Sequence, residues 1–487
     1  MIYKQRKLLK LKSRQDRERT EMGVQKRVKD YFEKNFTGVL HTTLNPEGPG
    51  VIRIHLVPPK IEEGEPANSI AILNGQDILP VNTTWTIILA EFIKEINKYE
   101  GKPLGSAETE AAVENTCKSV KKIYPFVSKK LIRRDLYTIM KTFEQVARGK
   151  WVDEDIDYLS IGDYAPHMRA PHRMDLMVSA MSVDGRWNCN QKCVHCYAAG
   201  QVHADEKELS TEEWKKIIDR CRDACIPQLT FTGGEPTMRS DLPELVRHAS
   251  WFVTRLNTNG IAMTPELCRE LREASLDSVQ ITFYSKDASI HNKLVGADRY
   301  EDTVSGIENA LAAGLSLSIN TPLCTLNRDY VETLKFLHEK GVMFVTCSGL
   351  ITTGNAALSE SESMQLSKEE IKEILRDAVE YAYANEMELS FTSPGWVEPE
   401  LCMELGINVP SCGACLSNMA VTPSGNVVPC QSWLSGDVLG NILQQDWSEI
   451  WESEACAEHR AYSALMLGKC PLRKGGDCMA IEGGCSL

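Results

Sequence analysis

The sequence predicts an α/β protein in which a parallel-sheet domain lies between a small α+β domain and a cysteine-rich C-terminal domain. A chain of 487 residues is too long to fold around one ordinary hydrophobic core. Strand and helix patterns alternate from about residue 175 to residue 395, which indicates a parallel sheet, open or closed. The 17 cysteines form two groups and a scattered remainder. These observations indicate two or three domains.

Composition and charge argue against several classes of protein. A hydrophobic content of 43% and a charged content of 25% are typical of a soluble globular protein. The net charge of −13 argues against broad nucleic-acid binding. The chain has no run of 18 apolar residues and no apolar signal core at its N-terminus, so we expect no membrane span and a cytoplasmic location. Disulfides are then the less favoured explanation for so many cysteines.

Residues 1–49 form a basic, helix-prone arm in a chain that is acidic overall. One interpretation is a solvated, partly disordered arm, and the other is an electrostatic handle for an acidic peptide or a partner protein. The cations concerned are Lys4, Arg6, Lys7, Lys10, Lys12, Arg14, Arg17 and Arg19.

The pattern of residues 50–150 predicts three short strands followed by three helices, which together form a winged-helix-like α+β domain. Asn74-Gly75 between two apolar runs is a strong hairpin signal. Asn82 is suited to cap the helix that follows. The predicted strands are Val51–Val57, Ile70–Leu73 and Ile78–Val81; the predicted helices follow Asn82, run near Ala111–Ile123 and run near Arg134–Val146.

This order of elements resembles the peptide-binding domain of the PQQ peptide chaperone, which is fused to many peptide maturases. The similarity lies in Leu79-Pro-Val-Asn82-Thr-Thr before an amphipathic helix, in Ile123-Tyr124-Pro125 and in Asp135-Leu136. The resemblance implies that a substrate leader peptide adds a strand to the exposed sheet edge. An unrelated α+β cap is the alternative.

Residues 175–395 alternate strand and helix, so catalytic groups should gather at the carboxyl ends of the strands. Helical patterns such as Thr211–Ala224, Pro265–Ala274 and Asp302–Ala313 separate the strands. The predicted strands are Leu176–Ser179, Gln228–Phe231, Arg255–Leu256, Ser278–Phe283, Ser316–Asn320 and Met343–Thr346.

Three cysteines follow the first of these strands in the run Cys189-Asn-Gln-Lys-Cys193-Val-His195-Cys196. Three thiolates can ligate three irons of a cubane and leave the fourth iron open, where a small molecule can bind. A zinc site with His195 as the fourth ligand is the alternative.

The C-x3-C-x2-C spacing with an aromatic residue before the last cysteine resembles the radical S-adenosylmethionine (radical SAM) superfamily. The resemblance implies a partial (β/α)6 barrel, a [4Fe-4S] cluster on Cys189, Cys193 and Cys196, and SAM on the fourth iron. His195 takes the aromatic position, whose backbone contacts the adenine amine in that family.

Further motifs match the same superfamily at strand ends, although a plain turn is the alternative for the glycine and Asn-Gly runs. Thr232-Gly233-Gly234-Glu235-Pro236 resembles the motif that holds the SAM amino group, and its glycines permit close backbone approach to a ligand. Asn257-Thr258-Asn259-Gly260 resembles a segment lining the SAM pocket, and Thr282 the residue contacting the ribose. His291-Asn292 with Val295-Gly296 matches a family segment in which an aspartate usually stands at position 292.

The second cysteine group lies within residues 396–487 and resembles the SPASM domain, which holds auxiliary iron–sulfur clusters. Cys415-x9-Gly425-x4-Cys430 fits its opening, and Ala420–Cys430 predicts a hairpin. The set is at least one cysteine short of the family pattern, so one auxiliary [4Fe-4S] cluster is expected. A second would need a non-cysteine ligand, a distant cysteine such as Cys402, or an open iron, and a zinc knuckle is the alternative. The expected ligands are Cys412, Cys415, Cys430, Cys470, Cys478 and Cys485.

The resemblance implies a peptide maturase that reductively cleaves SAM to a 5′-deoxyadenosyl radical, which abstracts a substrate hydrogen. We expect a thioether or carbon–carbon crosslink in a ribosomally made precursor peptide, with a flavodoxin or ferredoxin as reductant. One alternative is maturation of a small molecule or cofactor, such as a tetrapyrrole or a protein side chain. Another is a non-catalytic iron–sulfur electron carrier.

Overall fold

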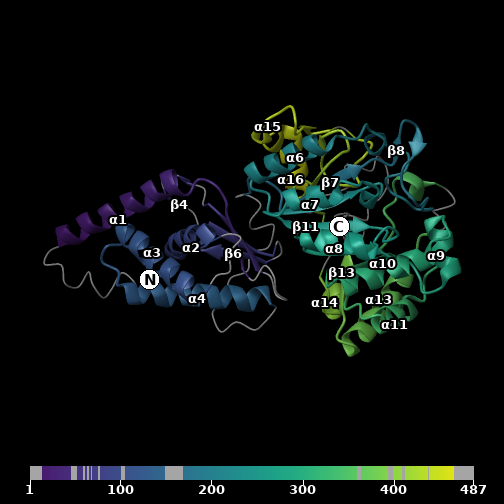
Figure 1. The fold of residues 1–487 in the computed structure, drawn as a ribbon, viewed down its shortest axis with the longest axis horizontal. Helices are drawn as coiled ribbons and strands as arrows, with labels where there is room; N and C mark the ends of the chain where they lie inside the picture. Colours follow the sequence, from purple (N-terminus) through teal and green to yellow (C-terminus); the bar gives the residue numbers. More distant parts are fainter. Residues whose placement is uncertain are drawn as a thin grey trace. The chain divides into compact units, whose positions relative to one another are not determined.

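The chain folds as two units, unit 1 from Met1 to His167 and unit 2 from Met168 to Leu487 (Figure 1). The computed structural model describes residues 14–44, 52–58, 61–62, 65–66, 69–74, 77–99, 105–148, 168–358, 364–392, 399–408, 412–436 and 438–465. Among the helices in these ranges, none combines the length and the apolar character needed to cross a bilayer.

Unit 1 contains a four-stranded antiparallel sheet in the order β1-β2-β5-β6. The strands are β1 (Leu40–Leu44), β2 (Ile52–Val57), β5 (Ser69–Leu73) and β6 (Asp77–Val81), and β3 (Ile61–Glu62) and β4 (Glu65–Pro66) form a short separate ribbon. The predicted hairpin is confirmed, because Leu73 pairs with Asp77 across it. Asn74 lies in the left-handed region at φ 50°, which asparagine tolerates, and its Oδ1 accepts a hydrogen bond from the Arg53 N–H at 2.9 Å.

The described part of unit 1 also has four α-helices: α1 (Arg14–Asn35), α2 (Thr83–Ile96), α3 (Ser106–Ile123) and α4 (Lys129–Ala147). Asn82 caps α2 as predicted, its Oδ1 accepting from the N–H groups of Thr84 at 3.1 Å and Trp85 at 3.0 Å. The buried residues of α2 join those of the sheet and of α3 and α4 in one hydrophobic core.

The arm predicted over residues 1–49 is in large part built into unit 1. Strand β1 lies inside this range and pairs with β2, and α1 buries Val28, Tyr31 and Phe32 in the core of unit 1, where Phe36, directly after the helix, joins them. The three helix positions 28, 31 and 32 recur at helical spacing, so they form an apolar face on a helix whose composition is mainly charged. Burial of that face explains why the helix packs here. Residues 1–13, with the first basic residues, lie outside the described ranges.

Unit 2 is built on a ten-stranded sheet in the order β15-β14-β13-β12-β11-β10-β7-β16-β17-β18. Seven consecutive members of it, from β15 to β7, belong to the region of alternating strands and helices and are parallel to one another. Six of these are the predicted strands, so the α/β expectation is confirmed. The seventh, β15, adds to the far edge. These seven strands are β7 (Arg173–Ser179), β10 (Gln228–Gly233), β11 (Val253–Thr258), β12 (Ser278–Thr282), β13 (Ser316–Pro322), β14 (Phe344–Ser348) and β15 (Glu388–Thr392).

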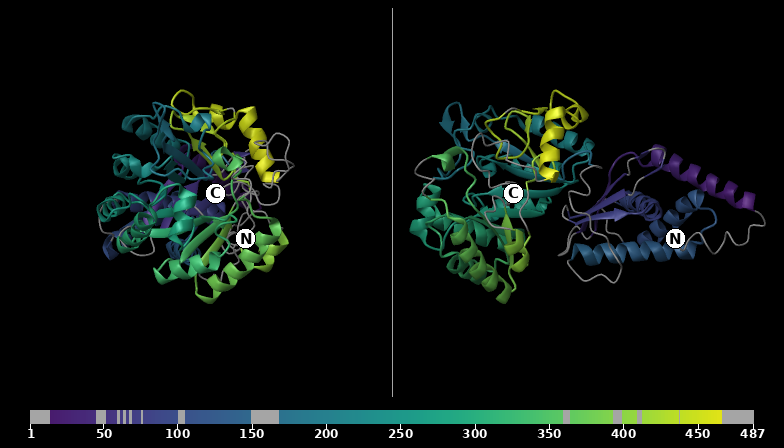
Figure 2. Two further views of the ribbon diagram at one scale, coloured as in Figure 1. Left: turned by 90° about the vertical axis from the view of Figure 1, so that its right-hand side faces the viewer. Right: turned by 180° about the vertical axis from the view of Figure 1, so that it is seen from behind.

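Helices between these strands lie on the outer side of the sheet (Figure 2). They are α6 (Thr211–Asp223), α7 (Leu242–His248), α8 (Pro265–Glu273), α10 (Tyr300–Ala312), α11 (Tyr330–Glu339) and α13 (Lys368–Ala384). Burial alternates along β12, where Val279 and Ile281 are fully buried and Gln280 and Thr282 are only half-buried. One face of the sheet is therefore apolar beneath the helices, and the other presents polar side chains.

The C-terminal segment continues the same sheet. Strand β16 (Asn418–Val421) pairs in parallel with β7, and β17 (Asn426–Val428) and β18 (Gly440–Asn441) follow in antiparallel order. The predicted hairpin is confirmed, with Gly425 at φ 88° in its turn. Helices α15 (Trp447–Trp451) and α16 (Glu454–Leu465) follow (Figure 1). The described part of residues 396–487 therefore contributes three strands to the sheet of unit 2.

Replacing Phe32 by alanine tests whether α1 belongs to the core of unit 1. Phe32 is 3% exposed, so Phe32→Ala should lower the free energy of unfolding by about 3–5 kcal/mol, from lost burial and the cavity left behind. Denaturant titration followed by hydrogen exchange at β2 and β5 measures the change. Met22 on the same helix is 61% exposed, so Met22→Ala is the matched control. Equal stability of the two variants would contradict the packing of α1.

Candidate functional site

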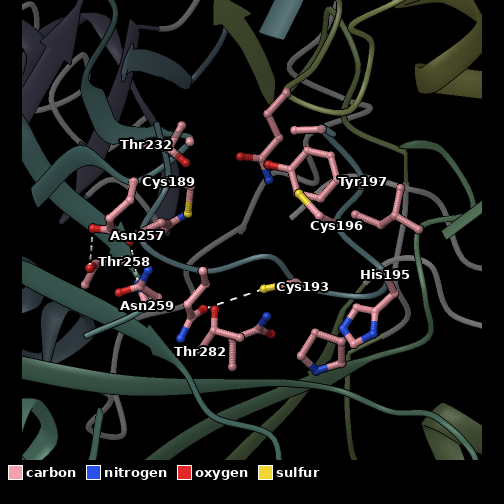
Figure 3. A pocket seen from close by; sticks show the side chains of 18 of the residues that line it. Cys189, Cys193, His195, Cys196, Tyr197, Thr232, Asn257, Thr258, Asn259 and Thr282 are labelled. Atoms are coloured by element: carbon pink, nitrogen blue, oxygen red, sulfur yellow. Dashed lines mark hydrogen bonds between the residues drawn. The ribbon is translucent and has the colours of Figure 1, made fainter. Parts of the chain in front are cut away.

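A cavity lies at the carboxyl ends of the parallel strands, where the sequence predicted the catalytic groups (Figure 3). Every predicted cofactor residue of the parallel-sheet domain except Pro236 lines it; Pro236 is buried and begins a short 3-10 helix, Pro236–Met238. The predicted residues that line the cavity are Cys189, Cys193, His195, Cys196, Gly233, Gly234, Glu235, Asn257, Thr258, Asn259 and Thr282.

The cysteine loop follows β7 and places the thiols of Cys189, Cys193 and Cys196 around one common space (Figure 3). Two of its backbone N–H groups donate to the carbonyls at the end of helix α9 (Ala288–Val295): Lys192 to Val295 at 3.0 Å and Val194 to Leu294 at 3.0 Å. An irregular loop has no ladder of its own, so such partners outside the loop fix its conformation.

A second anchor comes from the turn at residues 353–355, which the sequence did not single out. The Asn355 N–H donates to the Cys196 carbonyl at 2.9 Å, and its Nδ2 donates to the Cys193 carbonyl at 3.1 Å. Gly354 has φ +57°, and a Cβ there would lie 2.4 Å from the Tyr197 carbonyl oxygen. Asn355 therefore ties two of the three cysteines to the loop that follows β14, and a Cys193 or Cys196 displacement would break these bonds.

The segment from His291 to Gly296 supports the same loop. A Cβ on Gly296 would lie 2.2 Å from the Lys192 carbonyl oxygen, so the glycine allows α9 and the cysteine loop to touch. Asn292 Oδ1 accepts from the N–H groups of Arg299 at 3.0 Å and Tyr300 at 2.9 Å, and its Nδ2 donates to Asp298 at 2.6 Å. An amide makes both kinds of bond, so this packing role does not need the aspartate of the family pattern.

Burial controls protonation in the cysteine loop. It raises the pKa of Cys189 to about 12, and it also raises the pKa of Cys193 and Cys196. Ligand thiolates then need the positive charge of a metal to replace the proton. Burial lowers the pKa of His195 to about 4, so its ring is neutral at pH 7, packed edge-on against Tyr284 with centroids 5.0 Å apart.

The two glycines at the end of β10 make a close backbone contact that the sequence did not suggest. A Cβ on Gly233, which has φ +142°, would lie 2.3 Å from the Ser179 carbonyl oxygen, and one on Gly234 would lie 2.6 Å from the Ala180 carbonyl oxygen. Both glycines also line the cavity. The close approach that requires them is to the backbone at the end of β7, and it holds the start of the cysteine loop against β10.

Glu235 joins the ends of β10 and β11. Its Oε1 accepts from the Thr258 hydroxyl at 2.6 Å and from the Thr237 N–H at 3.0 Å, and its Oε2 accepts from the Asn259 N–H at 2.8 Å. Its side chain is buried, and burial raises its pKa although these donors oppose the shift. A carboxylate oxygen can accept two hydrogen bonds, so Oε2 could accept a further bond from a ligand in the cavity.

Several buried polar atoms that line the cavity have no hydrogen-bond partner among the described residues. They are Gln191 Nε2, Asn257 Oδ1, both ring nitrogens of His195, and both amide atoms of Gln431. A buried polar atom without a partner is costly, so these atoms indicate a polar ligand. Together with the three thiols they fit a cluster held by three cysteines, with a polar molecule bound beside it.

Gln431 was missed by the sequence reasoning. It directly follows Cys430 in the C-terminal segment, yet it lines a cavity formed mainly by the parallel strands. It reaches the cavity because β16 pairs with β7, the strand that leads into the cysteine loop. Its position next to a predicted cluster ligand was the one signal available in the sequence.

The structure brings together part of the second cysteine group. Cys412, Cys415 and Cys430 are buried, and the Cys415 N–H donates to the Pro429 carbonyl at 3.1 Å, so Cys415 and Cys430 lie on neighbouring segments. Cys402 is a buried residue of the helix α14 (Pro399–Glu404). The predicted ligands Cys470, Cys478 and Cys485 lie outside the described residues.

Comparison with known proteins identifies two matching families. Residues 188–337 match the radical SAM superfamily, and residues 412–478 match SPASM, an iron–sulfur cluster-binding domain. The chain is 27% identical over 321 residues to the PqqA peptide cyclase of Streptomyces rochei, covering 63% of this chain and 84% of the relative. It is 30% identical over 293 residues to the Fe-coproporphyrin III synthase of Methanosarcina barkeri, covering 54% of this chain and 72% of the relative.

A solved structure has a similar fold over nearly the whole chain. It is Streptococcus suis SuiB bound to the precursor peptide SuiA, with a TM-score of 0.56 and 14% sequence identity, and the match covers 91% of this chain and 95% of SuiB. At this identity the likeness concerns the fold.

Replacing Asn355 by alanine tests the second anchor of the cysteine loop. Asn355→Ala loses the side-chain bond to the Cys193 carbonyl, so a cluster on this loop should release iron to a chelator about 2- to 10-fold faster, the change expected for one net hydrogen bond. Absorbance of the iron–chelator complex gives the rate. Asn309→Ala is the control, because the Asn309 amide also donates to a backbone carbonyl, that of Met263, at 2.9 Å. Equal rates for both variants would remove Asn355 from this role.

Proposed function

The chain belongs to the radical SAM superfamily and carries a SPASM domain, and from this premise we propose that it installs a thioether or carbon–carbon crosslink in a ribosomally made peptide. When bound, the reduced cluster supplies the electron that cleaves SAM to methionine and a 5′-deoxyadenosyl radical, which removes a hydrogen atom from the peptide. A flavodoxin or ferredoxin would supply that electron to the protein.

The residues of the cavity divide this task. Cys189, Cys193 and Cys196 hold the cluster through their thiolates, on a loop whose backbone is hydrogen-bonded to the end of α9 and to Asn355. Glu235 supplies its remaining acceptor capacity to the SAM ammonium, at a position set by Thr258 and Asn259. Neutral, buried His195 serves through its backbone and its packing.

The polar lining positions SAM and substrate and replaces water around them. Thr282 and Asn257 project from the ends of β12 and β11 and serve the sugar and the adenine side of SAM. Gln431 has both a donor and an acceptor without a partner among the described residues, and a peptide group offers the complementary acceptor and donor. We therefore assign Gln431 to the backbone of the peptide substrate.

The observation that carries the peptide assignment is unit 1. It is a separate unit with its own core, and its antiparallel sheet ends in two edge strands, β1 and β6. An edge strand offers unpaired N–H and C=O groups, so an extended leader peptide can add to the sheet. The fold shared with SuiB, which was solved with its precursor peptide SuiA, spans unit 1 as well as unit 2 and supports this assignment.

A second candidate function is the modification of an iron tetrapyrrole. The Fe-coproporphyrin III synthase is slightly more identical to this chain than the peptide cyclase is, at 30% against 27%. Both matches leave more than a third of this chain uncovered, at 54% and 63% coverage. A tetrapyrrole enzyme would leave unit 1 without the task that the peptide assignment gives it.

Mass spectrometry of a candidate peptide tests the function. The small open reading frame beside the gene would be co-expressed with the wild-type chain and with Cys193→Ala, which cannot hold the cluster. Each crosslink should lower the peptide mass by two hydrogens when the wild-type chain is co-expressed, and the mass should not change with Cys193→Ala. An unchanged mass in ordinary water, together with deuterium incorporation when the reaction runs in deuterium oxide, would indicate epimerisation. Conversion of iron coproporphyrin by protein that leaves the peptide unchanged would establish the second function.

Replacing Gln431 by leucine separates peptide positioning from SAM cleavage. Gln431→Leu loses two hydrogen bonds to the peptide, so kcat/KM for the peptide should fall about 10- to 100-fold, the change expected for about 1–3 kcal/mol. 5′-Deoxyadenosine formed without peptide should change little, and chromatography measures both products. Gln444→Leu, an exposed glutamine of the same segment, is the control. A Gln431→Leu variant with the product yield of Gln444→Leu would contradict the assignment.

A further inference from the structure

Cys456 lies outside both cysteine groups that the motif analysis defined. It lies in the first turn of α16, and its side chain is fully buried at 0% exposure. A scattered buried cysteine is ordinarily a small hydrophobic residue surrounded by apolar atoms. The contacts of Cys456 are of another kind.

The Cys456 thiol meets a predicted cluster ligand. The Cys456 thiol lies beside the Cys415 thiol, and Cys430 is also close to Cys415. Three thiols from three separate segments are thus gathered in one buried place: the loop before β16, the end of the β17 hairpin, and α16.

One face of α16 carries the polar contacts to this group. Cys456, Arg460 and Ser463 are spaced as neighbours on a helix, at i, i+4 and i+7. Arg460 donates to the Cys456 sulfur at 3.5 Å, and its guanidinium lies 3.9 Å from the centroid of the Trp451 ring. The Ser463 hydroxyl donates to the Ala414 carbonyl at 2.7 Å, and its oxygen lies 3.5 Å from the Cys412 sulfur. The helix therefore presents one thiol and two donors to the loop from Cys412 to Cys415.

Two further features hold the gathered segments in place. Cys415 has φ +54°, a left-handed conformation that residues other than glycine, asparagine and aspartate rarely adopt, and the bond from its N–H to the Pro429 carbonyl holds it there. His459 of α16 packs edge-on against Trp433, with ring centroids 4.6 Å apart. The backbone N–H of Trp433 donates a hydrogen bond to the Cys430 carbonyl at 3.0 Å. The backbone conformation of the loop and the packing of α16 therefore both keep these thiols close together.

We propose that Cys456 is a ligand of the auxiliary iron–sulfur cluster, which it completes with Cys412, Cys415 and Cys430. This inference rests on the iron–sulfur chemistry of the proposed function. It supplies the ligand that the cysteine spacing lacked, from a helix inserted between the two halves of the cysteine group. Among the described residues, no three His, Cys, Asp or Glu side chains are grouped as the ligands of a single metal ion would be. A four-iron cluster differs, because it takes one thiolate at each iron and its ligands need not converge on one point. Arg460 then faces the cluster and offsets its negative charge.

Iron content and electron paramagnetic resonance (EPR) spectra of full-length variants test the proposal. The three cysteines of the first group are replaced by alanine, so that only auxiliary clusters contribute. On this background Cys456→Ser should lose about four irons per chain, or show the EPR signal of a three-iron cluster after anaerobic reconstitution. Cys221→Ser is the matched control, because Cys221 is also a fully buried cysteine on a helix of unit 2. The control should keep the iron and the spectrum of the background.

The other outcomes are as specific. A Cys456→Ser variant whose iron content and EPR spectrum are unchanged overturns the proposal. If Cys402→Ser loses iron while Cys456→Ser keeps it, the proposal is overturned as well. Zinc in place of iron at these thiols also overturns it. Far-ultraviolet circular dichroism identifies a variant that fails to fold, and Cys456→Asp, with an oxygen ligand at the same place, should then keep the cluster with a shifted EPR spectrum. SAM cleavage by the wild-type chain is assayed in parallel, and its absence counts against the proposed function alone.

Discussion

The site depends on one constraint: three thiols on an irregular loop must face the same small space. The loop has no regular hydrogen bonding of its own, so its backbone is held by other parts of unit 2. Leu294 and Val295 accept from one side of the loop, and Asn355 donates to Cys193 and Cys196 from the other. The strands after β7 thus act as a frame, because the loops at their ends supply the partners that the cysteine loop needs.

A second consequence of the frame is that ligand-binding groups are held by one another. Glu235 bonds the end of the neighbouring strand through Thr258 and Asn259, and the two glycines before it press against the end of β7. Parallel strands bring their carboxyl ends to one edge, so residues distant in sequence meet there. The same edge receives Gln431, because the C-terminal segment continues the sheet beside β7. The two cysteine groups are therefore connected through adjacent strands of one sheet.

Local signals predicted much of this structure correctly. Asn74 and Asn82 act through a left-handed turn and a helix cap, which depend on neighbouring residues alone. The six parallel strands follow from apolar runs separated by helical patterns. Strand β1 was missed because Leu40–Leu44 gains its stability from pairing with β2, and the apolar face of α1 was obscured by the surrounding charge. Both errors concern contacts between distant segments.

By itself, the sequence determined which chemical groups the protein has and where they stand along the chain. The cysteine spacing, the glycines beside Glu235 and the strand pattern indicated the family before any contact was known. Only the tertiary structure decided what each group touches: that the glycines face Ser179 and Ala180, and that Cys456 meets Cys415. The physical reason is that spacing fixes the distance between neighbours in a chain, whereas packing of whole helices and strands brings residues from distant segments into contact.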